Sequence, residues 1–307
     1  MGASREVGGV ELFMDQRGGG RPTIVFLPGA GLAALDYLRL HQKASEHWTS
    51  LLYDRAGTGY SERIPLPRTA EAVTDELFQL LQNVGADGVV LVGHSLGGLY
   101  ARHYATRFPA SMVGLVLLDP AHEDYDAYMP AELIQARAGN RTFALLNRAV
   151  DLAMRTPPTK ALLGVLPPVR HYQRLYTRLF EQELAHLAPD VRSALIASHC
   201  SLDWLAVGLR ETRGLDHLYT EVRSAGPMPD TPLIILSSTA NDAFRDAVSS
   251  GESQAMIEAE LSGKARLYAE LAQSVSRGEV RPVDTGHVTM AFRCTQAVLD
   301  AVRDVSQ

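Results

Sequence analysis

The sequence of 307 residues contains only two cysteines, Cys200 and Cys294. Two cysteines cannot form the disulfide framework of a small secreted protein, so we expect a reduced, cytoplasmic protein. No run of about 18 apolar residues occurs, and the sequence therefore predicts no transmembrane helix. Its first ten residues lack the basic and apolar stretches of a signal peptide, and we expect none.

Long basic blocks are also missing, and the formal net charge is −6. Nucleic acids and anionic membranes are therefore not expected as partners. The remaining composition, 46% hydrophobic and 21% charged, is ordinary for a globular protein of this length. We expect one domain, or one domain with an insertion, that acts as a monomer or homodimer on a small molecule.

Short apolar runs alternate with helical patterns through most of the chain. The run Thr23–Leu27 is continuous in apolar residues, which is typical of a strand buried on both faces of a parallel sheet. The predicted strands cover residues 9–14, 23–27, 50–53, 88–92, 113–118, 232–236 and 279–283. The predicted helices cover residues 32–45, 69–83, 99–108, 253–275 and 295–305. This alternation predicts an α/β protein with a mostly parallel central sheet flanked by helices.

Residues 121–230 interrupt the alternation. They contain no apolar strand run, they are rich in Leu, Ala and Arg, and proline pairs at 157–158 and 167–168 divide them into helical pieces. We therefore predict a core made of residues 1–120 and 231–307, with residues 121–230 inserted as a helical cap.

A G-x-S-x-G motif, Gly93-His94-Ser95-Leu96-Gly97, joins a predicted strand to a predicted helix. In this context the motif is typical of a nucleophile elbow, a sharp turn that holds the serine hydroxyl out of the sheet. A Cβ at Gly93 or Gly97 would crowd the bend. The helix start behind Ser95 supplies free backbone N–H groups for a developing oxyanion. A chance match in a chain with 25 glycines would not supply the flanking elements, so we predict that Ser95 is a nucleophile.

The order of these parts resembles the α/β-hydrolase superfamily over nearly the whole chain. It is most similar to bacterial serine hydrolases that carry a helical cap after the sixth strand. The motifs that carry the resemblance are Pro28-Gly29-Ala30-Gly31, residues 54–61, Gly93–Gly98 and Gly286-His287. The resemblance implies an α/β-hydrolase fold and a Ser-His-Asp triad, with His287 as the base because it follows the serine in chain order. It says little about the substrate, because this fold hosts many chemistries.

The resemblance leaves two candidates for the triad acid. In most relatives the acid lies in the loop after the strand that is here 232–236. Asp242 would take this place if the loop differs in length from that of the relatives by one residue. In other relatives it follows the sixth strand, where Asp119 ends the predicted strand directly. Position alone leaves both Asp119 and Asp242 open.

Other site residues are also implied by the resemblance. The backbone N–H groups of Ala30 and Leu96 would form an oxyanion hole. Gly29 and Gly31 would let the chain pass close to the substrate. His94 is expected at the substrate site, with its ring turned away from Ser95 to support the elbow.

No cofactor and no metal are expected. The run His122-Glu123-Asp124 consists of residue types that can bind a metal ion. The three are adjacent in the sequence, however, and no second group of ligand residues accompanies them. Residues 54–59 contain G-x-G without the remaining spacing of a phosphate loop, so we interpret them as structural.

These features predict a serine hydrolase that cleaves an ester, lactone or thioester through an acyl-enzyme. A serine in place of a carboxylate nucleophile argues against epoxide hydrolase or haloalkane dehalogenase chemistry. Apolar residues of the cap suggest a hydrophobic substrate: Leu162, Leu163, Val165, Leu166, Tyr172, Tyr176 and Phe180. Two alternatives stay open, an acyltransferase or cyclase with the same acyl-enzyme and a non-catalytic ligand-binding protein.

Overall fold

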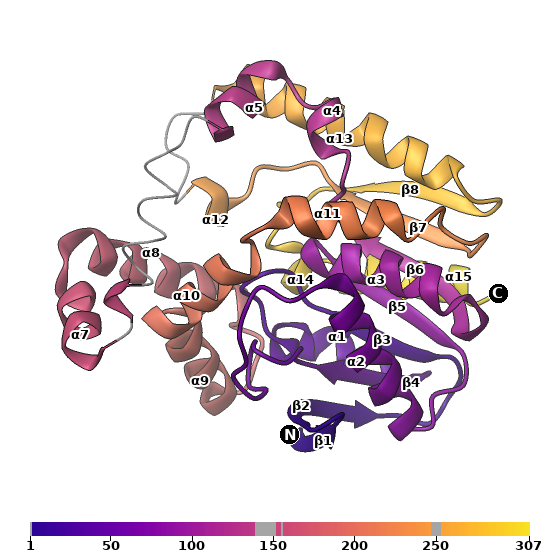
Figure 1. The fold of residues 1–307 in the computed structure, drawn as a ribbon, viewed down its shortest axis with the longest axis horizontal. Helices are drawn as coiled ribbons and strands as arrows, with labels where there is room; N and C mark the ends of the chain where they lie inside the picture. Colours follow the sequence, from indigo (N-terminus) through magenta and orange to yellow (C-terminus); the bar gives the residue numbers. More distant parts are fainter. Residues whose placement is uncertain (1, 139–151, 155, 247–252) are drawn as a thin grey trace.

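The structure is a computed structural model that describes residues 2–138, 152–154, 156–246 and 253–307. At its centre lies one eight-stranded sheet with the order β1-β2-β4-β3-β5-β6-β7-β8 (Figure 1). The strands are β1 (Ala3–Val7), β2 (Val10–Arg17), β3 (Thr23–Leu27), β4 (Thr49–Tyr53), β5 (Val89–His94), β6 (Met112–Leu118), β7 (Leu233–Ser238) and β8 (Gly278–Val283). Only the pairs β1–β2 and β2–β4 are antiparallel. The sheet is therefore mostly parallel, as the alternation predicted.

The burial of the strands explains which of them the sequence reveals. Every residue of β3, β5 and β7 is buried, and each strand contains an unbroken apolar run: 24–27, 89–92 and 233–236. Four of the five residues of β1 are exposed, and β1 pairs only with β2 at the edge of the sheet. The sequence does not predict β1 because an edge strand of this kind carries no apolar pattern.

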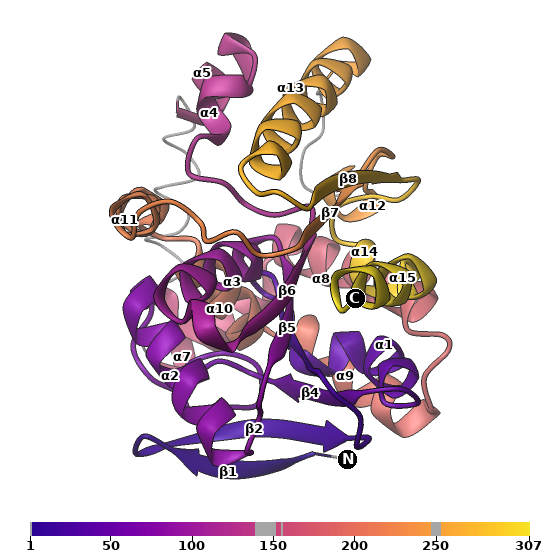
Figure 2. The same ribbon diagram turned by 90° about the vertical axis from the view of Figure 1, so that its right-hand side faces the viewer.

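Helices cover both faces of the sheet (Figure 2). One face packs against α1 (Leu38–Ala44), α14 (Met290–Arg293) and α15 (Thr295–Val305), and the other against α2 (Ala70–Asn83), α3 (Leu96–Arg107) and α13 (Gln254–Gln273). The remaining short elements of the core are η1 (Ala34–Tyr37), η2 (Pro109–Ser111) and α12 (Ala243–Asp246). The single helix predicted over 32–45 is instead η1 followed by α1, and the Asp36 carboxylate accepts the N–H of Ala33 at the start of η1.

Between β6 and β7 the described residues form helices and no strand. They are α4 (Tyr125–Tyr128), α5 (Ala131–Ala138), α7 (Pro157–Val165), α8 (Pro167–Glu183), α9 (Pro189–His199), α10 (Leu202–Glu211) and α11 (Leu215–Ser224). Prolines begin α7, α8 and α9, where a missing N–H costs no helical hydrogen bond. The helices α7 to α10 lie together beyond one end of the sheet, whereas α11 packs on α2 and α3 (Figure 1).

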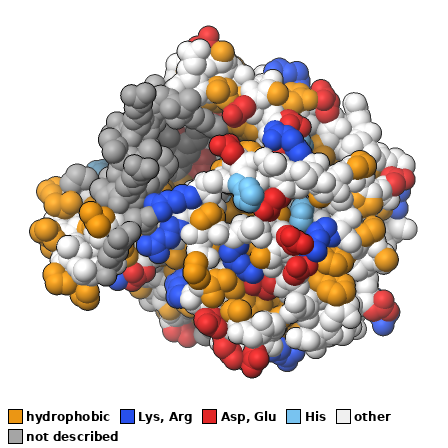
Figure 3. Space-filling view, viewed as in Figure 1, with side chains coloured by type: hydrophobic (Ala, Val, Ile, Leu, Met, Phe, Trp, Pro, Cys, Tyr) orange, Lys and Arg blue, Asp and Glu red, His pale blue; other side chains and the backbone are white. Residues whose placement is uncertain are grey.

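The outer end of this insertion carries exposed apolar side chains. Leu162, Val165 and Leu166 expose 64%, 50% and 42% of their surfaces. Figure 3 shows hydrophobic side chains gathered at the end of the molecule that α7 forms. Nowhere in the described ranges is a helix both long enough and apolar enough to cross a membrane.

Candidate active site

Ser95 lies in a strained turn between β5 and α3. Its φ of 50° and ψ of −118° are rare for a residue with a side chain. Asp119, with φ of 42°, is the other non-glycine residue with positive φ in the described part of the chain. Backbone hydrogen bonds hold both turns: Ser95 N–H donates to Leu118 at 3.0 Å, and Asp119 N–H donates to Leu236 at 2.8 Å. Backbone strain of this kind concentrates at functional sites.

Two glycines make the turn at Ser95 sterically possible. A Cβ on Gly97 would lie 2.1 Å from the carbonyl oxygen of Leu27, and a Cβ on Gly93 would lie 2.8 Å from the carbonyl oxygen of Gly97. Both distances are far below van der Waals contact. The glycines of the motif are therefore required by close backbone packing around Ser95.

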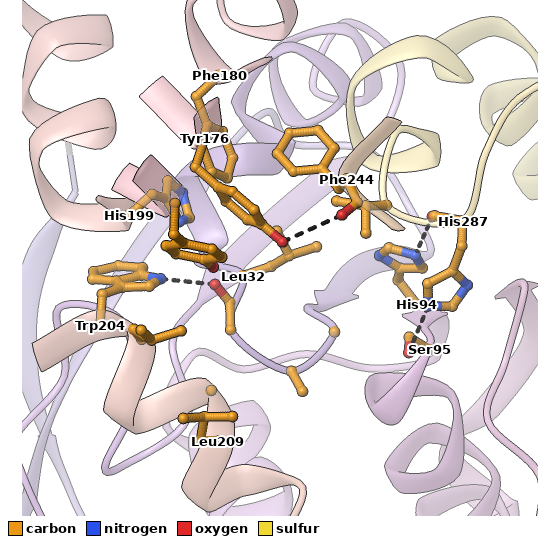
Figure 4. A pocket seen from close by; sticks show the side chains of 17 residues that line it. Leu32, His94, Ser95, Tyr176, Phe180, His199, Trp204, Leu209, Phe244 and His287 are labelled. Carbon is orange, nitrogen blue, oxygen red and sulfur yellow. Dashed lines mark hydrogen bonds between the residues drawn. The ribbon is translucent and has the colours of Figure 1, made fainter. Parts of the chain in front are cut away.

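His287 follows β8 and lies between Ser95 and Asp119. Its Nε2 is 3.0 Å from Ser95 Oγ (Figure 4). Its Nδ1 is 2.6 Å from Asp119 Oδ2. Both distances are those of hydrogen bonds. The structure thus brings Ser95, His287 and Asp119 into one hydrogen-bonded chain, although they are far apart in sequence.

The Asp119 carboxylate is buried and has several partners. Lys264 Nζ on α13 is 2.7 Å from Oδ1, and the Ser238 N–H donates to the same oxygen at 3.2 Å. The hydroxyl of Tyr268 lies 3.4 Å from Oδ1. Burial by itself would raise the pKa of Asp119, but the Lys264 ammonium and the hydrogen bond from His287 hold this pKa well below its usual range. Asp119 is therefore an anion at neutral pH.

The Asp242 carboxylate also contacts the His287 loop, but it accepts backbone N–H groups of that loop. Its Oδ2 accepts the N–H groups of Val288 and Thr289, and its Oδ1 accepts the N–H of Phe244 at 2.8 Å. A Cβ on Gly286 would lie 2.7 Å from Asp242 Cα, so only glycine lets the loop approach this closely. The structure therefore places Asp242 under the His287 loop, and it pairs the imidazole with Asp119.

His94 supports the loop from the side of the elbow. Its Nε2 donates to the carbonyl oxygen of His287 at 2.9 Å, so its Nδ1 is the acceptor for the Tyr37 hydroxyl at 2.6 Å. Burial lowers the pKa of His94 to about 3. His94 is therefore a neutral hydrogen-bonding group, and these two bonds occupy both nitrogens of its ring.

The loop after β3 passes directly over Ser95. A Cβ on Gly29 would lie 3.3 Å from Ser95 Cβ. No acceptor for the N–H of Ala30 or of Leu96 occurs in the described part of the protein.

The insertion holds this loop in place. Glu211 on α10 accepts the N–H of Gly31 at 2.9 Å and pairs with Arg55 at 2.7 Å. Arg55 also donates to the carbonyl of Pro28 at 2.7 Å, and the Trp204 indole N–H donates to the carbonyl of Gly31 at 2.7 Å. Arg55 thus has a structural role in its G-x-G segment. The sequence carries no signal for Glu211 or Trp204, because neither belongs to a motif.

A cavity of about 220 Å³ opens beside Ser95 and His287 (Figure 4). The loop after β3, the Ser95 turn and the His287 loop form part of its wall. The part that α8, α9, α10 and α12 supply is rich in rings and includes Tyr172, Tyr176, Phe180, His199, Trp204 and Phe244. Three of the seven apolar residues predicted to indicate the substrate, Tyr172, Tyr176 and Phe180, line it. The other four belong to α7 or follow it, where most are exposed.

His199, the last residue of α9, is buried in this wall. Its Nε2 lies 2.8 Å from Asp36, and its ring stacks on Phe180 at 4.2 Å. A lone histidine on a helix gives no sequence signal for such a position.

The possible metal ligands His122, Glu123 and Asp124 lie within 4.8 Å of one another. Both oxygens of Glu123 accept hydrogen bonds from Arg102 at 2.7 Å, and Asp124 pairs with Arg223 at 2.9 Å. Arginines thus already neutralise both carboxylates. That no metal binds here stays a prediction.

Comparison with known proteins supports the fold. A family model described as "Alpha/beta hydrolase family" matches residues 24–301. An esterase from Thermogutta terrifontis has 18% identity and a TM-score of 0.61 over 100% of both chains. An epoxide hydrolase from Vigna radiata has 15% identity and a TM-score of 0.67 over 99% of this chain and 98% of that one.

Curated relatives match over shorter stretches. A proline iminopeptidase from Heyndrickxia coagulans is 32% identical over 109 residues, which are 34% of this chain and 37% of the relative. A (lyso)-N-acylphosphatidylethanolamine lipase from Bos taurus is 32% identical over 96 residues, 30% of this chain and 27% of the relative. The chain thus spans well under half the length of these two relatives.

Proposed function

This chain belongs to the alpha/beta hydrolase family, and we propose that it is a serine hydrolase that cleaves a carboxylic ester, lactone or thioester of a small apolar molecule. The observation that carries the proposal is the hydrogen-bonded chain from Ser95 through His287 to Asp119, at 3.0 Å and 2.6 Å. A serine hydroxyl is a weak nucleophile unless a base accepts its proton, and His287 Nε2 lies at the distance that such a transfer needs.

In the proposed mechanism, Ser95 Oγ attacks the substrate carbonyl while His287 Nε2 takes its proton. Asp119 orients the imidazole and stabilises the imidazolium that forms. His287 then gives the proton to the leaving alcohol or thiol, and an acyl group remains on Ser95. Water attacks this acyl group with His287 again as base, and the acid product leaves.

The amides of Ala30 and Leu96 would donate to the oxyanion of the tetrahedral intermediate. Their position over and behind Ser95, and their lack of other acceptors in the described part of the chain, support this role. Preorganised donors of this kind contribute about 3 kcal/mol each to the transition state. Gly29 and Gly31 would shape the path of the loop past the substrate.

The cavity supports a small apolar substrate. Its volume of about 220 Å³ is below the range of about 300–1,000 Å³ that is usual for ligand sites, and the aromatic side chains in its wall favour apolar groups. Helices of residues 121–230 supply much of this wall, so we assign this insertion as the cap and residues 1–120 and 231–307 as the core. The names of a lipase and an esterase among similar proteins also support an ester as the bond cleaved.

A fluorophosphonate probe tests the assignment without knowledge of the natural substrate. We expect wild-type protein to be labelled and to hydrolyse p-nitrophenyl acetate and butyrate faster than the dodecanoate, because the cavity is small. Ser95→Ala should lose the label and reduce turnover by about 10⁴-fold or more, because it removes the nucleophile. Circular dichroism and thermal melting of both proteins provide the control for folding.

The outcome also separates the alternatives. Acyl transfer or cyclisation would appear as a new product when an alcohol or amine acceptor is added, with the same label on Ser95. A folded wild-type protein that takes no label and turns over no ester would contradict the proposal and favour a ligand-binding protein.

A further inference from the structure

Lys264 places a buried positive charge next to the carboxylate that pairs with His287. Its Nζ lies 2.7 Å from Asp119 Oδ1 and 2.8 Å from Oδ2, and it also donates to Ser238 Oγ at 2.8 Å. The side chains of Lys264 and Asp119 are 9% and 3% exposed. The ammonium therefore has three oxygen acceptors in a site that is nearly closed to water.

A serine hydrolase has no general need for such a cation. The triad acid stabilises the imidazolium through its negative charge, and a cation on the same carboxylate weakens this attraction. Burying a lysine is also unfavourable unless its charge is fully paired. A lysine in this position is therefore expected to change the behaviour of the triad, beyond its effect on packing.

We propose that Lys264 is a positioning residue that holds the Asp119 carboxylate toward His287 and keeps His287 an unprotonated base at lower pH; this inference rests on the serine-hydrolase function proposed above. Lys264 and Asp119 together carry no net charge. They therefore stabilise the protonated form of His287 less than an isolated carboxylate would. Free imidazole is the form that accepts the proton of Ser95, and the pair extends the pH range in which it is present.

The other groups that face His287 do not account for this effect, so we attribute it to the Asp119–Lys264 pair. His94, from β5, has a pKa lowered to about 3 by burial and is neutral in the range of interest. Burial also raises the pKa of Tyr268, on α13, well above its usual value, so its hydroxyl is neutral. Asp242 lies on the backbone side of the loop, where it accepts the Val288 and Thr289 amides.

The triad is expected to stay assembled when Lys264 is replaced. Asp119 Oδ1 would keep the Ser238 N–H at 3.2 Å and the Tyr268 hydroxyl at 3.4 Å, and Oδ2 would keep His287 at 2.6 Å. The pH profile is therefore measurable in the variants.

The test is the rate of fluorophosphonate inactivation across pH 4.5–9 for wild type, Lys264→Met, Lys264→Gln and Lys264→Arg. Both neutral variants should move the acid limb of the profile upward by about one pH unit, because a neighbouring positive charge is lost. Lys264→Gln can still donate a hydrogen bond, so its plateau at high pH should stay closer to wild type than that of Lys264→Met. Lys264→Arg retains the charge and should leave the acid limb in place.

Glu260→Gln is the matched control, because Glu260 lies on the same helix and its carboxylate accepts the hydroxyl of Tyr125. It should reduce thermal stability without moving the acid limb. An acid limb that coincides in wild type and both neutral variants would show that Lys264 is only structural and would overturn the inference. A shift in Lys264→Met that is absent in Lys264→Gln would also overturn it, because the charge would then not be the cause. Wild-type protein that takes no label would instead contradict the proposed function.

Discussion

The loops after β6 and β7 each contain an aspartate near His287, but the two carboxylates contact different parts of that residue's loop. Asp119 directly follows β6 and its carboxylate reaches the imidazole, and Lys264 lies beside it. Asp242 comes later, beyond the end of β7, and its carboxylate accepts backbone N–H groups. The comparison shows that the role of each carboxylate depends on the groups that contact it and does not depend on its position in the chain.

The sheet explains why both aspartates come close to His287. β6 and β7 are neighbouring parallel strands in which Leu118 pairs with Leu236, so both loops leave the same edge of the sheet. The left-handed backbone of Asp119 turns its side chain within one residue of the strand end. Asp242 is reached only after the loop has moved on, and there it lies beneath Gly286.

Between the two aspartates, the larger expected effect comes from Asp119→Asn. We expect kcat for p-nitrophenyl butyrate to fall by about 10³- to 10⁴-fold, because an amide neither orients the imidazole correctly nor stabilises the imidazolium. The same change in Asp242 should not have an effect of this size. If Asp242→Asn proves to be the more damaging variant, the assignment of the two carboxylates is reversed.

A double variant separates the triad from the ion pair. Asp119→Asn leaves Lys264 without its counter-charge, which also destabilises the fold. In Asp119→Asn with Lys264→Met, thermal stability should recover while kcat stays low. Recovery of both would indicate that Asp119 serves only the ion pair.

Asp242→Asn should have an intermediate effect. The single amide oxygen of asparagine can accept only some of the N–H groups that the carboxylate accepts. The free energy of unfolding should therefore fall by about 1–3 kcal/mol. The His287 loop would then be less well placed, with a loss in kcat of up to about 100-fold. Urea unfolding measures the change in stability, and steady-state kinetics measure the change in kcat. As a control, the acid limb of the pH profile of inactivation should equal that of wild type if the Asp119–His287 pair is intact.

The smallest expected effect concerns His94, which holds the carbonyl of His287. Its pKa in the folded protein is about 3, against 6.5 as its ordinary value, so the unfolded chain binds more protons between these values. Stability from this group is therefore fully present above pH 6.5 and is lost as pH falls toward 3. Between pH 7.5 and pH 5, wild type should lose about 2 kcal/mol more unfolding free energy than His94→Asn. Equal losses in the two proteins would mean that His94 is protonated in the fold.

Much of the fold and part of the site were predictable from the sequence. The continuous apolar runs of β3, β5 and β7 reflect burial on both faces, and the glycines around Ser95 reflect backbone contacts within the turn itself. These signals are local, so a single sequence reveals them. The edge strand β1 and the exposed apolar residues of α7 escaped prediction, because neither shows a clear amphipathic pattern against the core.

The sequence by itself determined a mostly parallel α/β sheet, a strained serine turn and a helical insertion between β6 and β7. Only the tertiary structure decided which aspartate faces the imidazole, that Lys264 joins it, and that Glu211 and Trp204 hold the loop over Ser95. The physical reason is distance along the chain. These contacts join residues separated by more than 100 positions, and whether two such side chains meet depends on strand register and helix docking, which no local pattern records.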